Sequence, residues 1–311
     1  MRRATWGLLF LAFAFGCGGR SADHSPPASP LSLQAQQLRE KGHRALTLGD
    51  VARAGTIFEE VRRVAESLDD RRLVAETLND LGGIADRQGH PADALVLHQK
   101  ALGIAHDLDD KALKAATLGY LGQAAQLLGN SDEAVGFYHQ ALLLARELKD
   151  RKLEAIVLNN LGLIQLRQGQ HEDAQQSFRQ AMTLNKELSE GRSLASNLAN
   201  LGSVLEESKQ LSEARGYFEQ ALDLDKELGD SEAVAKDLRR LGGIAELQNR
   251  LEEATGYYER AYASYVALKM APKAAEILKR LSRLAKMNGS QDLMAEYDSR
   301  LKALMASPDS K

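Results

Sequence analysis

Cationic side chains gather near the C-terminal end of this sequence. Lysine or arginine stands at seven positions that are candidates for one site: Lys236, Arg239, Arg240, Lys279, Arg280, Arg283 and Lys286. Residues three or four apart share a helix face, so several of these cations are expected to lie together. Such a group suits carboxylates or phosphates, which arginine binds through paired hydrogen bonds. Alternatively, nearby acids such as Asp237, Glu246 and Glu276 pair with these cations at a solvated surface.

No motif of a known catalytic chemistry accompanies these cations. The seven histidines form no His-Glu-x-x-His pair for zinc, and no serine lies in a nucleophile elbow. Cys17 is the sole cysteine, so neither a disulfide nor a site with several thiolates can form within the chain. Carboxylates are plentiful, but their spacing selects none as an acid or base. We therefore expect no enzymatic activity, no cofactor and no metal.

Length, charge and composition narrow the class of protein. The chain has 311 residues, whereas a single core rarely grows past roughly 250–300 residues, so two domains or one repeat array is expected. Aromatic residues make up only 5% while leucine and alanine are abundant, which favours helices over sheets. The formal net charge of −3 gives no basic field, so nucleic acid is not an expected partner.

The N-terminal residues are typical of a targeting segment. Arg2 and Arg3 precede an uncharged apolar run over residues 4–16, which is shorter than the ~20 residues that a membrane-spanning helix needs and fits a secretory signal. The run ends Ala14-Phe15-Gly16-Cys17, which resembles the lipobox of bacterial lipoproteins, although leucine is usual where Ala14 stands. The alternative is an ordinary signal peptide cut near Ala22, which would leave the protein secreted.

The lipobox resemblance implies a signal peptide over residues 1–16 and an acylated Cys17, for example with palmitate. The lipid would anchor the protein to a membrane of the bacterial cell envelope, expected to be the outer membrane with the protein facing the periplasm. Residues 17–32 hold three of the six prolines together with serine and glycine, and such a composition predicts a disordered tether.

A 40-residue repeat fills most of the remaining chain. The pair Leu-Gly recurs at Leu81, Leu121, Leu161, Leu201 and Leu241. Alanine follows each of these leucines after 13 and after 20 residues, and between them, at 17 residues, stand His98, Tyr138, Phe178, Phe218 and Tyr258. A fixed period of this length is typical of a solenoid whose copies must stack to bury their apolar faces.

Each copy predicts two helices, the first running roughly from Leu73 to Gln88 in the copy that holds Leu81. Glycine ends the first helix at Gly89, Gly129 and Gly169, Asn249 can do the same, and Lys209 departs from the pattern. The second helix is followed by a residue able to cap the next one, at Asp70, Asp110, Asp150 and Asp230, with Glu190-Gly191 as the exception. Glycine and alanine at fixed sites let helices approach closely, and the aromatic residue fills the gap between them.

These residues resemble the tetratricopeptide repeat, whose signature places Leu-Gly in the first helix and Ala, an aromatic and Ala in the second. The 40-residue period, with phrases such as Asn159-Asn160-Leu161-Gly162, looks like the longer repeats of kinesin light chain and the spindle-orientation adaptors. The resemblance implies an all-α, right-handed superhelical solenoid of stacked antiparallel helix pairs. We assign to it residues 33–305, as about seven pairs with a degenerate first and last copy, followed by a disordered tail over 306–311.

The resemblance also implies a concave groove, lined by the first helix of each pair, that binds a peptide. The groove positions in the middle copies are Asn79, Asp80, Asp86, Tyr120, Gln123, Gln126, Asn159, Asn160, Asn200, Ser203 and Glu206, and the seven cations line its last two copies. Asparagine suits a peptide backbone because its amide both donates and accepts hydrogen bonds. We expect a non-enzymatic adaptor for protein partners at the cell envelope. More specific alternatives are a pilotin-like assembly factor for an outer-membrane secretin or pilus, or an adaptor for cell-wall hydrolases.

Overall fold

Helices occupy nearly all of residues 29–306, the part of the chain that this computed structural model describes. That part contains fourteen helices and no strand. Their bounds are α1 Pro30–Thr47, α2 Val51–Ser67, α3 Arg71–Arg87, α4 Pro91–Asp107, α5 Lys111–Leu127, α6 Ser131–Glu147, α7 Arg151–Arg167, α8 His171–Glu187, α9 Gly191–Glu207, α10 Leu211–Glu227, α11 Ser231–Leu247, α12 Leu251–Ala267, α13 Ala271–Met287 and α14 Gln291–Ala306.

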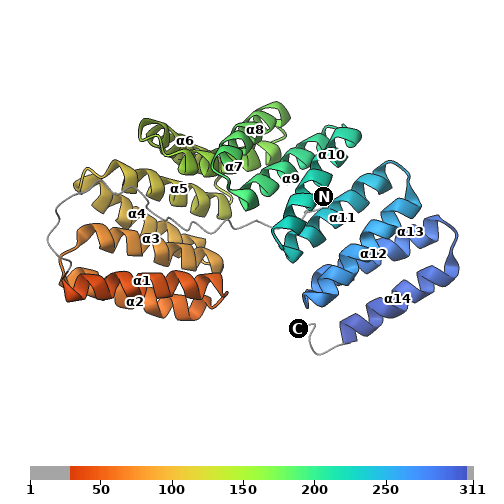
Figure 1. Ribbon diagram of the computed structural model, residues 1–311, viewed down its shortest axis with the longest axis horizontal. Helices are drawn as coiled ribbons and strands as arrows, with labels where there is room; N and C mark the ends of the chain where they lie inside the picture. The colour runs from red at the N-terminus through yellow and green to blue at the C-terminus, as the bar shows by residue number, and fades with distance from the viewer. Residues whose placement is uncertain (1–28, 307–311) are drawn as a thin grey trace. The chain divides into compact units, whose positions relative to one another are not determined.

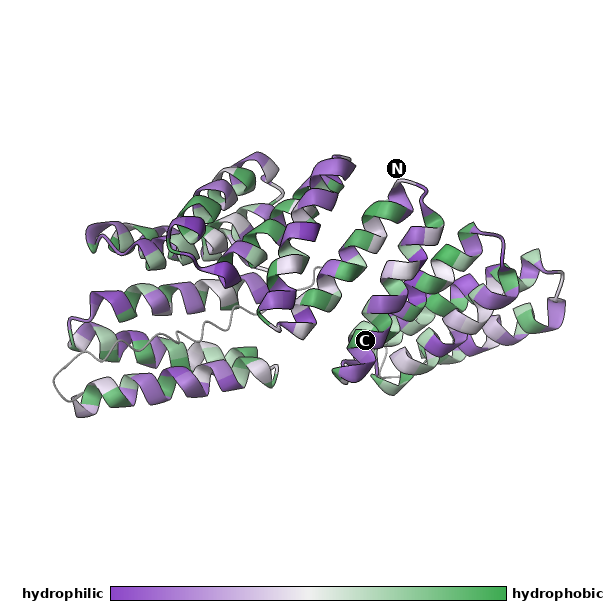
Figure 2. Cartoon of the chain, turned by 45° about the horizontal axis from the view of Figure 1, so that its top comes forward, coloured by the Kyte–Doolittle hydropathy of each residue, from purple (hydrophilic) through white to green (hydrophobic). Residues whose placement is uncertain are grey.

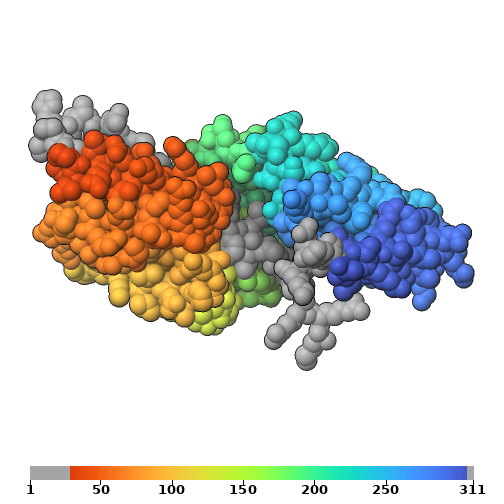
Figure 3. All heavy atoms as spheres, turned by 90° about the horizontal axis from the view of Figure 1, so that it is seen from below, coloured from red at the N-terminus to blue at the C-terminus, as the bar shows by residue number. Residues whose placement is uncertain are grey.

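The helices pack as consecutive pairs within two compact units, which meet in the sequence between Asn160 and Leu161. In the first unit α1 packs on α2, α3 on α4 and α5 on α6, and in the second the pairs are α9/α10, α11/α12 and α13/α14 (Figure 1). In the first unit α2 also packs on α3, so side chains fill the space between neighbouring pairs (Figure 3). Hydrophobic and hydrophilic residues alternate within single helices (Figure 2), as expected when one face is buried. The predicted all-helical stack of pairs is confirmed.

The helix ends follow the predicted caps. Asp70, Asp110, Asp150 and Asp230 each accept a hydrogen bond from the backbone N–H three residues later, at 2.9–3.1 Å. Glu190 makes no such bond, so it is the exception that the sequence indicated. Gly89, Gly129 and Gly169 adopt the left-handed conformation, and Asn249 and Lys209 do so with φ of 58° and 63°. Lys209 therefore departs from the pattern in residue type but not in backbone geometry.

The start of the repeat array differs from its prediction. The first helix begins at Pro30 instead of residue 33, because Ser29 caps it and accepts a hydrogen bond from the N–H of Ser32 at 3.1 Å. The predicted tether is thus wrong for residues 30–32, and the last helix continues to Ala306. The signal peptide, Cys17 and most of the tether lie outside the described residues, as do residues 307–311.

The glycine of each Leu-Gly pair lies against the aromatic ring of the same copy. Phe58, Tyr138, Phe178, Phe218 and Tyr258 are fully buried, and so is His98, which takes the ring position in its copy. A Cβ atom added to Gly122 would lie 2.5 Å from Cε1 of Tyr138, and one on Gly202 would lie 2.7 Å from Cε1 of Phe218. These distances leave no room for a methyl group on either glycine, so the ring packs directly on the helix backbone. The alanines at the two flanking motif positions are also completely buried.

This contact predicts opposite effects for two glycine substitutions in the first unit. Gly122→Ala should destabilise the unit by about 1–3 kcal/mol, because the buried Tyr138 ring must move. Gly136→Ala is the matched control, since Gly136 lies exposed in α6 with nothing within 4 Å of an added Cβ. It should leave stability unchanged or raise it by up to ~1 kcal/mol through helix propensity. Urea denaturation followed by circular dichroism measures both, and equal behaviour of the two variants would contradict the packing argument.

Candidate functional site

Most of the neutral groove candidates lie inside the helix packing. Six of them are less than a tenth exposed: Asn79, Tyr120, Gln126, Asn159, Asn200 and Ser203. Asn79 donates a hydrogen bond from Nδ2 to Oγ1 of Thr117 at 2.7 Å and accepts one at Oδ1 from Nδ1 of His98 at 3.0 Å. Ser203 donates from Oγ to the carbonyl oxygen of Ala199 at 3.0 Å. Asn79 and Ser203 therefore serve the packing of their own unit, contrary to their assignment to an open groove.

Two amide side chains of the predicted set remain partly exposed. Gln123 in α5 and Asn160 in α7 are half-buried. Asn160 accepts only a long hydrogen bond, 3.5 Å from Nδ2 of Asn159. These two residues are the neutral candidates that a ligand on the first unit can reach.

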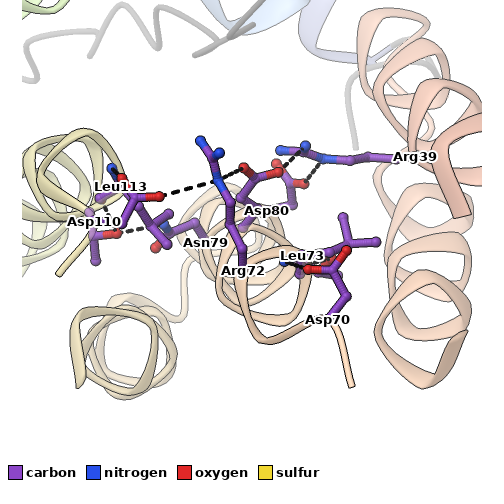
Figure 4. A network of polar contacts seen from close by, with 11 residues as sticks. Arg39, Asp70, Arg72, Leu73, Asn79, Asp80, Asp110 and Leu113 are labelled. Atoms are coloured by element: carbon purple, nitrogen blue, oxygen red, sulfur yellow. Dashed lines mark hydrogen bonds and ion pairs between the residues drawn. The ribbon is translucent and has the colours of Figure 1, made fainter. Parts of the chain in front are cut away.

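An ion-pair network joins α1, α3 and the start of α5 in the first unit (Figure 4). Arg39 pairs with Glu76 and, at 3.1 Å, with Asp80, while Arg72 lies 3.2 Å from Glu76 and 3.3 Å from Asp110. Burial raises the pKa of the Asp80 carboxyl, and the nearby Arg39 guanidinium opposes that rise. The network ties successive copies together through charges that already have partners.

Asp86 and His98 differ from that network because each has buried polar atoms without a hydrogen-bond partner. Asp86 is 3% exposed, and neither of its carboxylate oxygens has a hydrogen-bond partner. Burial raises the pKa of this carboxyl to about 7. His98 uses Nδ1 for Asn79, while its Nε2 is buried without a partner, and burial lowers the pKa of the imidazole to about 3.

The cations of the second unit mostly have acidic or aromatic partners. Lys236 lies 2.8 Å from Glu232, Arg280 lies 3.4 Å from Glu276, and Arg283 pairs with Glu246. The Arg239 charge opposes the rise that burial causes in the pKa of Tyr265. Lys279 is exposed and takes part in no ion pair among residues 29–306. Most of the seven cations are thus paired within the protein, as the alternative interpretation of the sequence stated. Lys279 and Lys286 of α13 are exposed, so their charges are the most accessible to a ligand.

Arg240 belongs to a buried network rather than to an open surface. Its Nη1 donates to Oδ1 of Asp237 at 3.1 Å, and its guanidinium lies 5.6 Å from the centroid of the Phe218 ring. Asp237 is 1% exposed and lies within hydrogen-bond reach of Asp225 on α10, which is 6% exposed. Burial and the neighbouring Asp237 charge raise the pKa of Asp225 to about 7. Oδ2 of Asp237 is buried and has no hydrogen-bond partner. When Asp225 is protonated, its carboxyl group can donate a hydrogen bond to Asp237.

The sequence contained a signal for this carboxyl pair. Forty residues earlier the equivalent positions are Asn185 and Asn197, and Nδ2 of Asn185 donates to Oδ1 of Asn197 at 2.7 Å. Comparison of the two copies would have shown that a neutral buried pair is replaced by two acids.

The tetratricopeptide repeat profile matches residues 38–106, 113–187 and 193–267, which is more than half of the chain. The chain belongs to the tetratricopeptide repeat family. None of the curated proteins matches it.

Solved structures share this fold at low sequence identity. BtubC (BKLC) from P. vanneervenii is 21% identical with a TM-score of 0.58, over 78% of this chain and 93% of that one. The Rap conjugation gene regulator of plasmid pLS20, in complex with the Phr* peptide, is 18% identical with a TM-score of 0.63, over 94% and 82%. PilF of Pseudomonas aeruginosa is 23% identical with a TM-score of 0.56, over 78% and 96%.

The tetratricopeptide repeat copies of this chain share the same packing positions and differ in the polar and charged side chains at the remaining positions. Among residues 29–306, no group of three or more His, Cys, Asp or Glu side chains is arranged to hold a metal ion. None of the helices in the same range is long and apolar enough to cross a bilayer.

The Asp225–Asp237 pair predicts a pH dependence of stability. Because the folded pKa of Asp225 is raised, the folded chain binds more protons than the unfolded chain between about pH 4 and 7. The stability that protonated Asp225 contributes is therefore fully present at low pH, and it is lost as the pH rises through about 7. Between pH 5 and 7.5 the loss should be about 2 kcal/mol.

Asp225→Asn should remove that part of the pH dependence, because an asparagine can donate to Asp237 without a bound proton, as Asn185 does to Asn197. Asp223→Asn, on the exposed side of the same helix, is the control and should keep the wild-type slope. Urea unfolding between pH 5 and 8 measures the effect. An unchanged slope in Asp225→Asn would rule out the shared proton.

Proposed function

We propose that this protein is a non-enzymatic scaffold that binds peptide segments of partner proteins on the exposed faces of its odd-numbered helices. The observation that carries the proposal is the charge on α13. Among the five groove positions of that helix, Lys279, Arg280, Arg283 and Lys286 are cationic, and Glu276 is the one acid. Lys279 and Lys286 are exposed, so an acidic peptide can reach them without breaking the core.

Two further features support binding of an extended chain. Gln123 and Asn160 have partly exposed amides on the first unit. Such an amide can both donate a hydrogen bond to a peptide backbone and accept one from it. The Rap regulator of similar fold was solved with a peptide, and peptide binding by stacked helix pairs is what we propose for this chain.

The proposal places the scaffold at the bacterial cell envelope, held by a lipid on Cys17. This part depends on the sequence around residues 14–17. A single short acyl chain binds membranes only marginally, so stable anchoring requires more than one chain, as bacterial lipoproteins carry. The pilotin-like and hydrolase-adaptor roles are particular forms of the same scaffold function.

Exposed charge on α13 predicts salt-dependent binding of an acidic peptide. A flexible glutamate-rich dodecapeptide should bind Lys279→Ala/Lys286→Ala about 3- to 30-fold more weakly than wild type at low salt, as expected for two charged contacts at an exposed site. Near 1 M salt the difference should vanish because screening already removes the attraction. Lys186→Ala/Lys226→Ala on even-numbered helices is the matched control. Fluorescence anisotropy measures the affinities, and equal weakening by both double variants would exclude a specific face.

Membrane anchorage predicts that Cys17→Ser changes the fate of the whole protein. The wild type should fractionate with membranes and require detergent for release. The variant should appear in the soluble fraction or keep its signal peptide, because no acyl chain can be attached. Fractionation with mass spectrometry of the mature N-terminus provides the measurement. Identical processing and fractionation of the two proteins would exclude the lipid anchor.

A further inference from the structure

In two copies of the repeat, side chains from two fixed motif positions lie within hydrogen-bond distance of each other. One follows the motif leucine by five residues, and the other is the ring that comes twelve residues later. In one copy the hydroxyl of Tyr138 donates to Oε1 of Gln126 at 3.0 Å. In another the hydroxyl of Tyr258 donates to Oε2 of Glu246 at 3.1 Å. The corresponding residues around Leu81 are Asp86 and His98.

The next odd-numbered helix completes the site around Glu246. Arg283, which is 37 residues further on, pairs with Oε1 of Glu246, and Arg280 lies 4.0 Å from its Oε2. Glu246 therefore has two guanidinium groups and a hydroxyl as partners. This is how the chain stabilises a carboxylate at that position of the repeat.

Asp86 has the same place in its copy but none of these partners. The residue equivalent to Arg283 is Gln123, and the residue equivalent to Arg280 is Tyr120, whose ring stacks on His98 with 5.2 Å between centroids. The imidazole of His98 is shorter than a phenol and carries no hydroxyl. Both oxygens of Asp86 are consequently without a partner, and burial alone accounts for its raised pKa, with no described cation opposing it.

We propose that Asp86 is a binding position for a cationic side chain of the partner, a guanidinium or ammonium group that enters beside Gln123. This inference rests on the proposed peptide-binding function and adds that the peptide carries arginine or lysine where it crosses α3 and α5. A buried carboxylate without a counter-charge is strongly destabilising unless it finds a partner or a proton. Gln123 is half-buried and its side chain has three rotatable bonds, so it can move aside to admit the ligand. In this site the ligand supplies the group that Arg283 supplies to Glu246.

A variant that fills the site from within tests this geometry without any peptide. Gln123→Arg places a guanidinium at the position equivalent to Arg283. In the wild-type background it should raise the thermal midpoint by about 4 °C. In the Asp86→Asn background, Gln123→Arg should raise the thermal midpoint by less than half as much, because the amide offers no charge to pair with. Gln123→Met, which is uncharged and of similar length, should show no difference between the two backgrounds. Asp86→Asn itself should fold, since the equivalent position in the next copy holds the amide of Gln126.

The cation site is then probed directly with the tripeptide acetyl-Gly-Arg-Gly-amide, followed by amide NMR shifts of the full chain. Binding should shift signals near Asp86 and Gln123, and it should weaken at least 5-fold in both Asp86→Asn and Gln123→Arg. Equal stabilisation by Gln123→Arg in the two backgrounds, or equal tripeptide binding by Asp86→Asn and wild type, would overturn the inference. If the glutamate-rich peptide still bound α13 in that case, the proposed scaffold function would stand while the Asp86 site fell.

Discussion

The contact between a backbone glycine and a buried ring is the constraint on which the helix pairs from α1/α2 to α11/α12 depend. Because the odd-numbered helix has no side chain at that glycine, the ring from its partner lies directly on the backbone, as Phe218 does on Gly202. The two helices can then approach closely, and their rotation about their own axes is fixed. That rotation determines which side chains turn toward the neighbouring copy and which toward solvent. The faces that could bind a partner are therefore consequences of core packing, and a change at the glycine would alter surface chemistry as well as stability.

The fold was predictable because the repeat carries redundant signals. The Leu-Gly pair, the two alanines and the ring recur every 40 residues, and the caps at Asp70 and Gly89 separate the helices, so the helix bounds were right to within about two residues. The error at the start of the array has a local cause. A proline-rich composition indicates a segment without a core, but serine followed by proline is also a favourable helix start. Composition and capping chemistry gave opposite indications at Ser29 and Pro30, and the capping signal was correct.

The site was less predictable because spacing fixes the direction of a side chain but not what covers it. Asn79 occupies a groove position by spacing, yet its amide bonds Thr117 from the next odd-numbered helix and His98 from its own pair. Arg240 looks like a surface cation when α11 is considered alone. Spacing within α11 indicates its pairing with Asp237, but it does not reveal Asp225 on α10, which lies next to Asp237. Only comparison with Asn185 and Asn197 in the preceding copy would have exposed that pair. In a repeat protein, the informative comparison is between equivalent positions of different copies.

That comparison also separates structural charges from charges that have a further role. At the position five residues after the motif leucine, the chain holds a neutral amide in Gln126, a paired acid in Glu246 and an acid without partners in Asp86. The backbone frame is the same in each copy, so the frame itself does not require a charge there. Glu246 is stabilised by arginines of the next copy, whereas Asp86 lowers the stability of its unit while it has no counter-charge. Glutamine in the neighbouring copy shows that an uncharged solution exists at this position. The cation that we propose to reach Asp86 from outside the chain would supply the counter-charge that Glu246 receives from Arg283.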